Sequence, residues 1–378
     1  MSDFGEAALL EAAAAETGLS DFGEPSYLEG LRVGLEAVGR RGGGALLEQH
    51  FAARARVALI GRLHSEHSWR THPGYRGTRI AAPLIITGMS RSGTSALHQL
   101  LAADPQFQWI PHWIAGAPTV RPPREQWEEH PSYQAQLARL ESEFHRNPQQ
   151  RATHNIEAAL PEECINVMCQ TFASMMFTTT LPLPSYYDWL VTQDETPSYE
   201  RYARNLKLIG AATPSEQPWL LKNPSHTGGM AALLKVFPDA RIVVTHRDPV
   251  AAIASAASMT QIISGKLWGP GEAGRHRLAV SLHNITRLEQ ARIGREDRFH
   301  DVRYRDFMSD PMAVVTGIYS RFKLALTPSA EQAMRKWLAA NPQGKFGAHR
   351  YTPEEYGLGA GEIRELFAAY IARHGLDS

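Results

Sequence analysis

One stretch, residues 83–104, constrains the fold of this chain more than any other. It reads PLIITGMSRSGTSALHQLLAAD, so a short apolar run leads into a loop with two glycines and two serines. The run at residues 84–86 is long enough for one strand buried on both faces, as in a parallel sheet. After Thr94 and Ser95, the leucines fall on one face of a helix. The stretch therefore predicts a strand, a glycine-containing loop and a helix in direct succession.

Such a loop is suited to bind an anion. Its amides and the first free N–H groups of the helix point to a common centre, where the helix dipole adds partial positive charge. The spacing is that of a P-loop, but Thr94 stands where a nucleotide triphosphatase carries the lysine that reaches the outer phosphates. The only cation in the loop is Arg91. This pattern counts against ATP or GTP, and a plain strand, turn and helix is the alternative interpretation.

A second candidate anion site follows a later strand. Residues 241–246 read RIVVTH, and Arg247-Asp-Pro then opens a helix that carries Ser255 eight residues after the arginine. Eight residues are about two helical turns, so both side chains share one face. A guanidinium can bind phosphate bidentately, and a hydroxyl supplies one further donor. The rhythm of strand and helix predicts a parallel sheet, so we expect residues 88–94, residues 222–226 and Arg247 to face one crevice at the strand ends.

Composition excludes several classes of function. Lys+Arg and Asp+Glu both count 39, so no general field attracts nucleic acid or an anionic membrane. Cys164 and Cys169 form no metal or disulfide pattern, which suits a reducing compartment. No apolar run approaches the roughly 18–20 residues of a membrane span, and the acidic N-terminus lacks a targeting pattern. We expect a cytoplasmic protein with no membrane span, no nucleic-acid partner and no metal site.

The organisation of the chain is predicted as one large structural unit. Residues 1–80 read as a helical layer packed on the core or on another subunit, so a homodimer stays open. Residues 81–378 read as a single α/β domain without a convincing internal boundary. Within it we expect a second strand over residues 108–114 and a mainly helical segment over residues 135–181, beside a central parallel sheet flanked by helices.

Three segments, at their spacing, resemble the sulfotransferases that use 3′-phosphoadenosine 5′-phosphosulfate (PAPS), especially the bacterial branch with a GxxRSGT loop. The resemblance covers roughly residues 83–358. The 3′-phosphate element of that family matches Arg247 and Ser255, and Tyr304 is similar to its tyrosine beside the adenine. Its C-terminal GxxGxx-basic loop matches residues 344–350, with Lys345 and Arg350 as cations. Its 5′-phosphosulfate loop matches Gly88, Ser90, Arg91, Ser92, Gly93, Thr94 and Ser95.

The resemblance implies a three-layer P-loop-like fold and a transferase that moves a sulfuryl group from PAPS to a hydroxyl of a small acceptor. The product would be adenosine 3′,5′-bisphosphate. Because a sulfuryl group carries less charge than a terminal phosphate, no Mg²⁺ is obviously required. Asp248, the best candidate for a metal-binding strand-end acid, is explained as a helix cap. The alternatives are a P-loop kinase or NTPase that uses ATP·Mg, and a relative that binds nucleotide without catalysis.

The catalytic groups are less clearly indicated than the anion sites. Arg91 stands in the place of the family's loop lysine, and Lys222 is a strand-end lysine like one that the family uses. His226 is the first candidate for the general base, although the family's histidine lies two residues after that lysine and here it lies four after. Glu163, its neighbour Glu162 and also His112 remain candidates.

The acceptor is not identified by the sequence. A run of methionine and phenylalanine at residues 165–177 is followed by Tyr186, Tyr187, Trp189 and Tyr199. Core packing explains such a cluster. The alternative is an aromatic wall for an acceptor, which favours an apolar or amphiphilic alcohol over a very polar sugar.

Overall fold

The computed structural model describes residues 4–146, 157–214, 217–342 and 352–376. The chain divides into two compact units. Unit 1 consists of Met1–Ile80 and Ile110–Glu216, and unit 2 consists of Ala81–Trp109 and Gln217–Ser378. The expected division after residue 80 coincides with one of these limits. The grouping of residues 110–216 with the N-terminal helices adds a division that the sequence pattern does not show.

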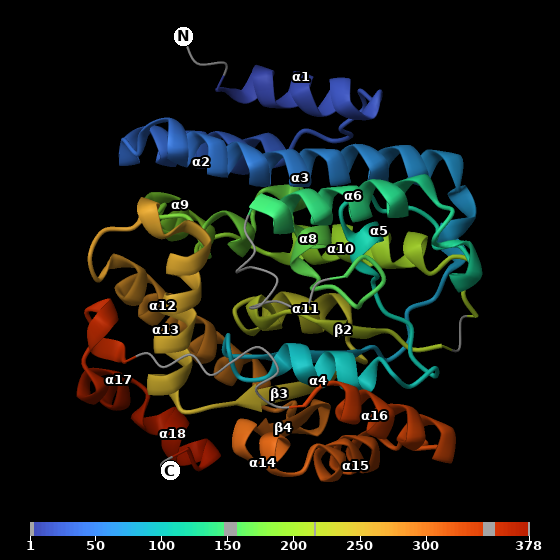
Figure 1. Ribbon diagram of the computed structural model, residues 1–378, viewed down its shortest axis with the longest axis vertical. Helices are drawn as coiled ribbons and strands as arrows, with labels where there is room; N and C mark the ends of the chain where they lie inside the picture. The colour runs from blue at the N-terminus through green and yellow to red at the C-terminus, as the bar shows by residue number, and fades with distance from the viewer. Residues whose placement is uncertain (1–3, 147–156, 215–216, 343–351, 377–378) are drawn as a thin grey trace. The chain divides into compact units, whose positions relative to one another are not determined.

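Unit 1 is helical. Three N-terminal helices, α1 (Glu6–Thr17), α2 (Tyr27–Arg41) and α3 (Gly44–Thr71), pack on one another, with the long α3 in contact with both others (Figure 1). The later helices of the unit are shorter: α5 (His112–Ala115), α6 (Pro131–Arg146), α8 (Ile165–Met168), α9 (Pro184–Leu190) and α10 (Thr196–Ile209).

The aromatic cluster expected from the sequence lies in the core of unit 1. The rings of Phe172 and Phe177 stack with centroids 4.9 Å apart, and Phe177 also packs edge-on against Tyr186. Phe172, Phe177, Tyr186 and Tyr199 are all fully or almost fully buried. Burial of this much aromatic surface stabilises the unit, and core packing accounts for these four side chains.

Unit 2 is built on a four-stranded sheet in the order β2-β1-β3-β4, in which every neighbouring pair is parallel. The strands are β1 (Leu84–Gly88), β2 (Leu220–Lys222), β3 (Arg241–His246) and β4 (Phe299–Arg303). Each of the first three is buried along almost its whole length, as expected for strands covered on both faces. The parallel sheet flanked by helices that the sequence predicted is confirmed.

The strand expected over residues 108–114 is wrong. Gln108 forms a single parallel bridge with Trp219, Pro111 forms an isolated antiparallel bridge with Pro161, and helix α5 begins at His112. Pro111 intervenes, and its ring removes the N–H that a continued ladder would need.

The helices of unit 2 cover the sheet. α4 (Thr94–Leu101) buries Leu97, Leu100 and Leu101 against residues of β1, β2 and β3, as its apolar periodicity predicted. The other helices of the unit are α11 (Met230–Val236), α12 (Pro249–Ser264), α13 (Glu272–Arg292), α14 (Tyr304–Ser309), α15 (Pro311–Phe322), α16 (Pro328–Ala340), α17 (Ala360–Leu366) and α18 (Ala368–His374). Helices α14 and α15 pack on β4, while α17 packs on α12 (Figure 1).

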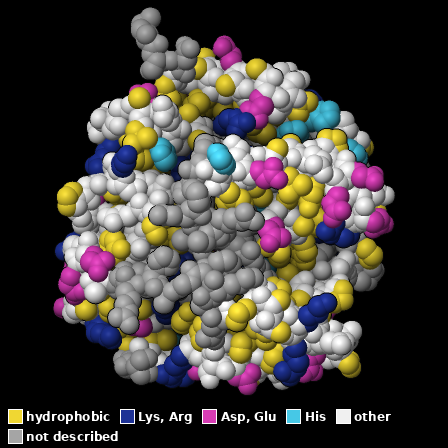
Figure 2. Space-filling view, in the orientation of Figure 1, with side chains coloured by type: hydrophobic (Ala, Val, Ile, Leu, Met, Phe, Trp, Pro, Cys, Tyr) yellow, Lys and Arg dark blue, Asp and Glu magenta, His cyan; other side chains and the backbone are white. Residues whose placement is uncertain are grey.

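The surface fits the balanced composition. On the face that Figure 2 shows, acidic and basic side chains are interspersed rather than gathered into a block of one sign. Among the helices in the described ranges, none combines the length and the apolar character that crossing a membrane requires.

Candidate anion-binding and catalytic site

The loop after β1 has a backbone that only certain residues tolerate. Gly88 has φ +144°, and a Cβ on it would lie 2.3 Å from the carbonyl oxygen of Thr245 on β3. Gly93, at φ +89°, caps α4, and Arg91 has φ +71° although it is not glycine. A left-handed arginine is strained, and such strain is typical of functional loops. Gly88 allows β1 and β3 to approach closely at the point where the loop begins.

The hydroxyl of Ser92 holds this loop against the sheet. It donates to the carbonyl oxygen of Met89 at 2.6 Å and lies 2.6 Å from Oγ1 of Thr245. The first turn of α4 has no side-chain cap among the described residues, so its amides remain available to a ligand. The glycine loop and the uncapped helix start that the sequence predicted therefore follow one another in unit 2.

Lys222 lies at the end of β2, the strand next to β1 and its loop. Lys222, the last residue of β2, is only 4% exposed and donates from Nζ to Oγ of Ser95 at 2.9 Å. Ser95 is in the first turn of α4, so the lysine head points at the helix start. Sequence reasoning expected Lys222 to join the loop, and the structure brings the two together.

Arg91 is the centre of the second group of contacts. Its Nε donates to Oγ of Ser255 on α12 at 3.1 Å, and its carbonyl oxygen accepts from Nη1 of Arg247 at 2.8 Å. The guanidinium of Arg247 also lies over the ring of Tyr304, 4.5 Å from its centroid. Tyr304 in turn packs close to Gly93, because a Cβ on that glycine would lie 3.0 Å from Cδ2 of the tyrosine. These residues were all expected at the donor site, and in unit 2 they meet.

His226 lies in the 3₁₀ turn Pro224–Thr227, just past β2. Its side chain is fully buried, and burial lowers its pKa to about 3. Asn223 shapes this turn by accepting from the amide of Ser225 at 3.0 Å. A histidine in this environment stays neutral at ordinary pH and has a low affinity for a proton.

His112 and Glu162 form a pair in unit 1. Nδ1 of His112 contacts a carboxylate oxygen of Glu162, and both side chains are largely buried. Backbone hydrogen bonds hold the two segments together, from the Glu162 amide to the carbonyl of Ile110 at 2.8 Å and from the His112 amide to that of Leu160 at 2.9 Å. Nε2 of His112 is buried and has no hydrogen-bond partner among the described residues. Glu162 therefore contacts Nδ1, and Nε2 makes no hydrogen bond to another described residue.

Glu163, the next residue, is half-buried, and its amide donates to Oε1 of Glu162 at 2.6 Å. Glu162 thus accepts from both His112 and the neighbouring amide. Two further predicted donor-site residues, Lys345 and Arg350, lie outside the described residues.

Arg277 on α13 is a residue that sequence reasoning missed. It is 7% exposed, and burial followed by the nearby charge of Arg91 lowers its pKa to about 10. The signal was present in the helical periodicity of α13, which places Arg277 on the face formed by Ala273, Gly274 and Leu278. Arginine seldom lies on such a face without a partner.

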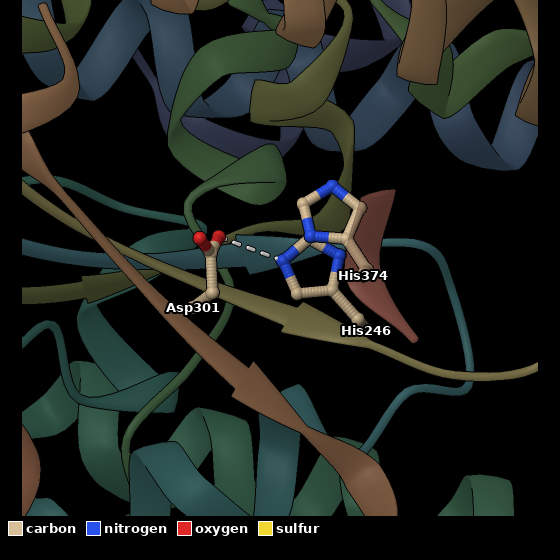
Figure 3. Close-up of side chains that lie close together, drawn as sticks. All are labelled: His246, Asp301 and His374. Carbon is tan, nitrogen blue, oxygen red and sulfur yellow. Dashed lines mark hydrogen bonds and ion pairs between the residues drawn. The ribbon is translucent and has the colours of Figure 1, made fainter. Parts of the chain in front are cut away.

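Figure 3 shows a second polar cluster in unit 2, formed by His246, Asp301 and His374. Asp301 accepts a hydrogen bond from His246 Nε2 at 2.8 Å, and Arg292 donates to both of its oxygens at 2.7 and 2.6 Å. His374 Nε2 bonds to Glu289 at 3.0 Å. A guanidinium that grips both carboxylate oxygens supplies the positive charge that a cation would otherwise bring. We therefore assign the cluster a structural role, which is to tie α18 and α13 to β3 and β4.

Comparisons with known proteins agree with this geometry. Residues 83–328 match the model of a family described as the sulfotransferase family. The sulfotransferase STF1 from Mycobacterium tuberculosis H37Rv is similar in structure, with TM-score 0.88 and 34% identity over 98% of this chain and 100% of that one. STF9 from Mycobacterium avium gives 0.84 and 29%, over 99% and 97%. The omega-hydroxy-beta-dihydromenaquinone-9 sulfotransferase Stf3 of Mycobacterium bovis is 25% identical, over 78% of this chain and 75% of its own.

Proposed function

The chain belongs to the sulfotransferase family, and from this premise we propose that it transfers a sulfuryl group from PAPS to a hydroxyl of an apolar or amphiphilic acceptor. The observation that carries the choice of donor is the arrangement around Arg91. The loop arginine, Ser255 and Arg247 are joined by hydrogen bonds, next to a helix start without a cap. A sulfuryl donor with two anionic groups requires hydrogen-bonding side chains on two elements of the fold.

Residues of unit 2 have separate roles in the proposed transfer. The amides of residues 88–94 and the side chains of Arg91 and Lys222 bind the 5′-phosphosulfate. Arg247 and Ser255 bind the 3′-phosphate, and the ring of Tyr304 packs near the adenine and beneath Arg247. Lys345 and Arg350 complete the donor site in this proposal.

The reaction is an in-line displacement at sulfur. The acceptor oxygen forms a bond to sulfur while the bond from sulfur to the bridging oxygen of the 5′-phosphate breaks, and the acceptor proton passes to a base. The leaving group is adenosine 3′,5′-bisphosphate, whose new negative charge develops on that phosphate. Preorganised cations at this position stabilise the transition state more than the ground state. Lys222, buried and directed at Ser95, fits this role.

For the base we propose His112, positioned by Glu162, ahead of Glu163 and His226. A general base needs a pKa near the working pH and a free lone pair within reach of the proton. Burial lowers the pKa of His226 to about 3, which makes it a weak base. In His112, the contact of Nδ1 with Glu162 fixes the tautomer in which Nε2 carries the lone pair. Glu163 follows Glu162 directly, and its amide donates to Oε1 of that residue.

The acceptor class rests on likeness to a relative as well as on chemistry. The name of Stf3 assigns it an omega-hydroxylated dihydromenaquinone, which is a lipid with a terminal hydroxyl. We propose that this chain also acts on a lipid-like alcohol. We also place the protein in the cytoplasm, where its two buried free cysteines suit a reducing environment.

The proposal is tested by transfer of ³⁵S from labelled PAPS into an extractable product, in EDTA, with long-chain isoprenoid alcohols and simple phenols as acceptors. We expect labelled product with the alcohols. The alternative, a kinase or NTPase, predicts no ³⁵S transfer and instead hydrolysis or transfer from γ-labelled ATP with Mg²⁺. In that case the strand-end Asp248 would have to hold the metal, although it caps α12 by accepting from Val250.

A further inference from the structure

Two arginines on α13 are equally buried but differ in their partners. Arg277 and Arg292 are each 7% exposed. Arg292 donates to both oxygens of Asp301, so its charge is compensated. Arg277 has no hydrogen bond or ion pair among the residues that the structure describes, and its Nε is completely buried. A buried charge without a partner is costly, so this arginine calls for an explanation.

The surroundings of Arg277 make the cost larger. The charge that acts on it most among the described residues is that of Arg91, which is of the same sign. Its pKa stays near 10, so the guanidinium is protonated at neutral pH. A like charge that acts on a buried arginine destabilises the ligand-free protein. An anion that contacts both guanidinium groups would offset the repulsion and the cost of burying the charge.

The neighbours of Arg277 point to the same place. α13 packs along α12, and α12 carries Ser255, which accepts from Arg91. Arg91 belongs to the loop after β1 whose amides and helix start are arranged for an anion. Arg277 therefore approaches the anion loop from a third element, after the loop itself and α12.

We propose that Arg277 is a further donor-binding residue, whose guanidinium binds a phosphate or sulfate group of the donor together with Arg91. This rests on the proposed function for the identity of the donor, but the anion site itself follows from the buried, unpaired arginine. The chemistry recognised is a phosphate or sulfate ester. A planar guanidinium suits it because it can donate two parallel hydrogen bonds.

The test compares Arg277→Met with Arg292→Met, by calorimetric titration and by thermal unfolding without ligand. Arg277→Met should weaken the binding of adenosine 3′,5′-bisphosphate at least about tenfold. It should also raise the unfolding temperature of the ligand-free protein, by roughly 1–3 °C, because an unpaired buried charge is lost. Arg292→Met should lower that temperature and leave the affinity unchanged. Arg275→Met, also on α13, removes an exposed ion pair with Glu362 of α17 and should change neither.

The two readouts separate the proposal from a structural role. A residue needed only for packing would lose stability on substitution, and donor affinity would fall only with it. Unchanged affinity of Arg277→Met for the bisphosphate overturns the proposal, whatever its stability. A titration with adenosine 5′-monophosphate locates the contact. A loss for both nucleotides assigns Arg277 to the 5′ group, and a loss for the bisphosphate alone assigns it to the 3′-phosphate.

Inorganic sulfate separates this proposal from the proposed function. If wild-type protein does not bind the bisphosphate, but is stabilised by sulfate in a way that Arg277→Met abolishes, the anion site stands and the nucleotide donor is wrong. If wild-type protein binds neither the bisphosphate nor sulfate, the inference about Arg277 fails as well. If it binds the bisphosphate and Arg277→Met binds it equally, only the inference about Arg277 fails.

Discussion

Nε of Arg91 lies 3.1 Å from Oγ of Ser255, so the anion loop and the helix of the second anion element are joined by a hydrogen bond. The two residues lie far apart in the sequence, yet both follow strands that pair directly, β1 and β3. This hydrogen bond therefore joins the two candidate anion elements within unit 2. A substitution in either element should therefore change anion binding at the other.

Loss of Arg247 should separate the two donor phosphates in a binding experiment. Arg247→Ala is expected to weaken the binding of adenosine 3′,5′-bisphosphate by roughly 1.5–3 kcal/mol, the range for hydrogen bonds to a charged group, which is about 10- to 150-fold. Adenosine 5′-phosphosulfate, which lacks the 3′-phosphate, should lose far less. Arg241→Ala, at the opposite end of β3, is the matched control. Equal losses for both ligands would show that Arg247 does not bind the 3′-phosphate.

Ser255→Ala removes the hydroxyl that we propose donates a hydrogen bond to the 3′-phosphate. The same hydroxyl accepts from Nε of Arg91. We expect a smaller loss of bisphosphate affinity, about 0.5–1.5 kcal/mol, because the hydroxyl is uncharged. Ser258→Ala on the same helix controls for changes in α12. In a double-mutant cycle with Arg91→Gln, the effects of Ser255→Ala should be clearly non-additive, since the two side chains are bonded. Additive losses would indicate that the bond contributes nothing to donor binding.

The base should be found by single-turnover transfer. His112→Ala should lower the rate of transfer by about 10²–10⁴-fold with donor affinity unchanged, because a base acts only in the chemical step. Glu162→Gln should give part of this loss and shift the pH–rate profile, since it acts through His112. Nitrophenol acceptors, which ionise readily, should recover most of the rate.

Parallel measurements on His226→Ala and Glu163→Gln complete the assignment of the base. Normal transfer by His112→Ala together with a large loss in either of these variants would move the base to that residue.

Acid should destabilise the protein through its buried histidines. Burial lowers the pKa of both His226 and His246 below the ordinary value of about 6.5, so the unfolded chain binds the extra protons. The stability contributed by the neutral side chains is complete above pH 6.5 and falls as pH decreases below it, by up to about 1.4 kcal/mol per pH unit for each histidine. His226→Asn should flatten the decrease in unfolding temperature between pH 6.5 and 5, whereas substitution of the exposed His72 by Gln should not. A slope that His226→Asn leaves unchanged would contradict this.

Asp301→Asn should destabilise unit 2 without changing donor affinity directly. The carboxylate accepts from His246 and Arg292, which lower its pKa well below the usual range for aspartate, although burial opposes the shift. Loss of its charge leaves Arg292 uncompensated, and we expect a decrease in unfolding free energy of roughly 1–3 kcal/mol. The decrease should become smaller as pH falls below about 3.9, because the aspartate of the unfolded wild-type chain then binds a proton that the native carboxylate does not bind. A rise in stability on adding Zn²⁺ that depends on Asp301 would instead support a metal site.

Local patterns predicted the secondary structure around the candidate donor site. The strand at residues 84–86, the glycine loop and the leucine face of α4 each follow from a run of neighbouring residues, and so does the cap of α12 by Asp248 before Pro249. Parallel pairing follows from the order of these elements, and it predicts Lys222 at the same edge of the sheet as the loop, where its Nζ donates to Ser95.

Features that depend on contacts between distant segments were missed or left open. His112 and Glu162 are 50 residues apart and are brought together beside an isolated bridge between Pro111 and Pro161. No periodic pattern in the sequence predicts that bridge. The burial of His226 depends on packing around a short 3₁₀ turn. In the sequence, nothing distinguishes Arg277 from the other charged residues of its helix. The anion loop that it approaches lies nearly two hundred residues earlier.

Donor binding tests the central claim most directly. Wild-type protein should bind adenosine 3′,5′-bisphosphate in the presence of EDTA, in a calorimetric titration that saturates at one site per chain, and ATP with Mg²⁺ should compete poorly. Saturable binding of ATP with Mg²⁺, with no heat from the bisphosphate, would contradict the account.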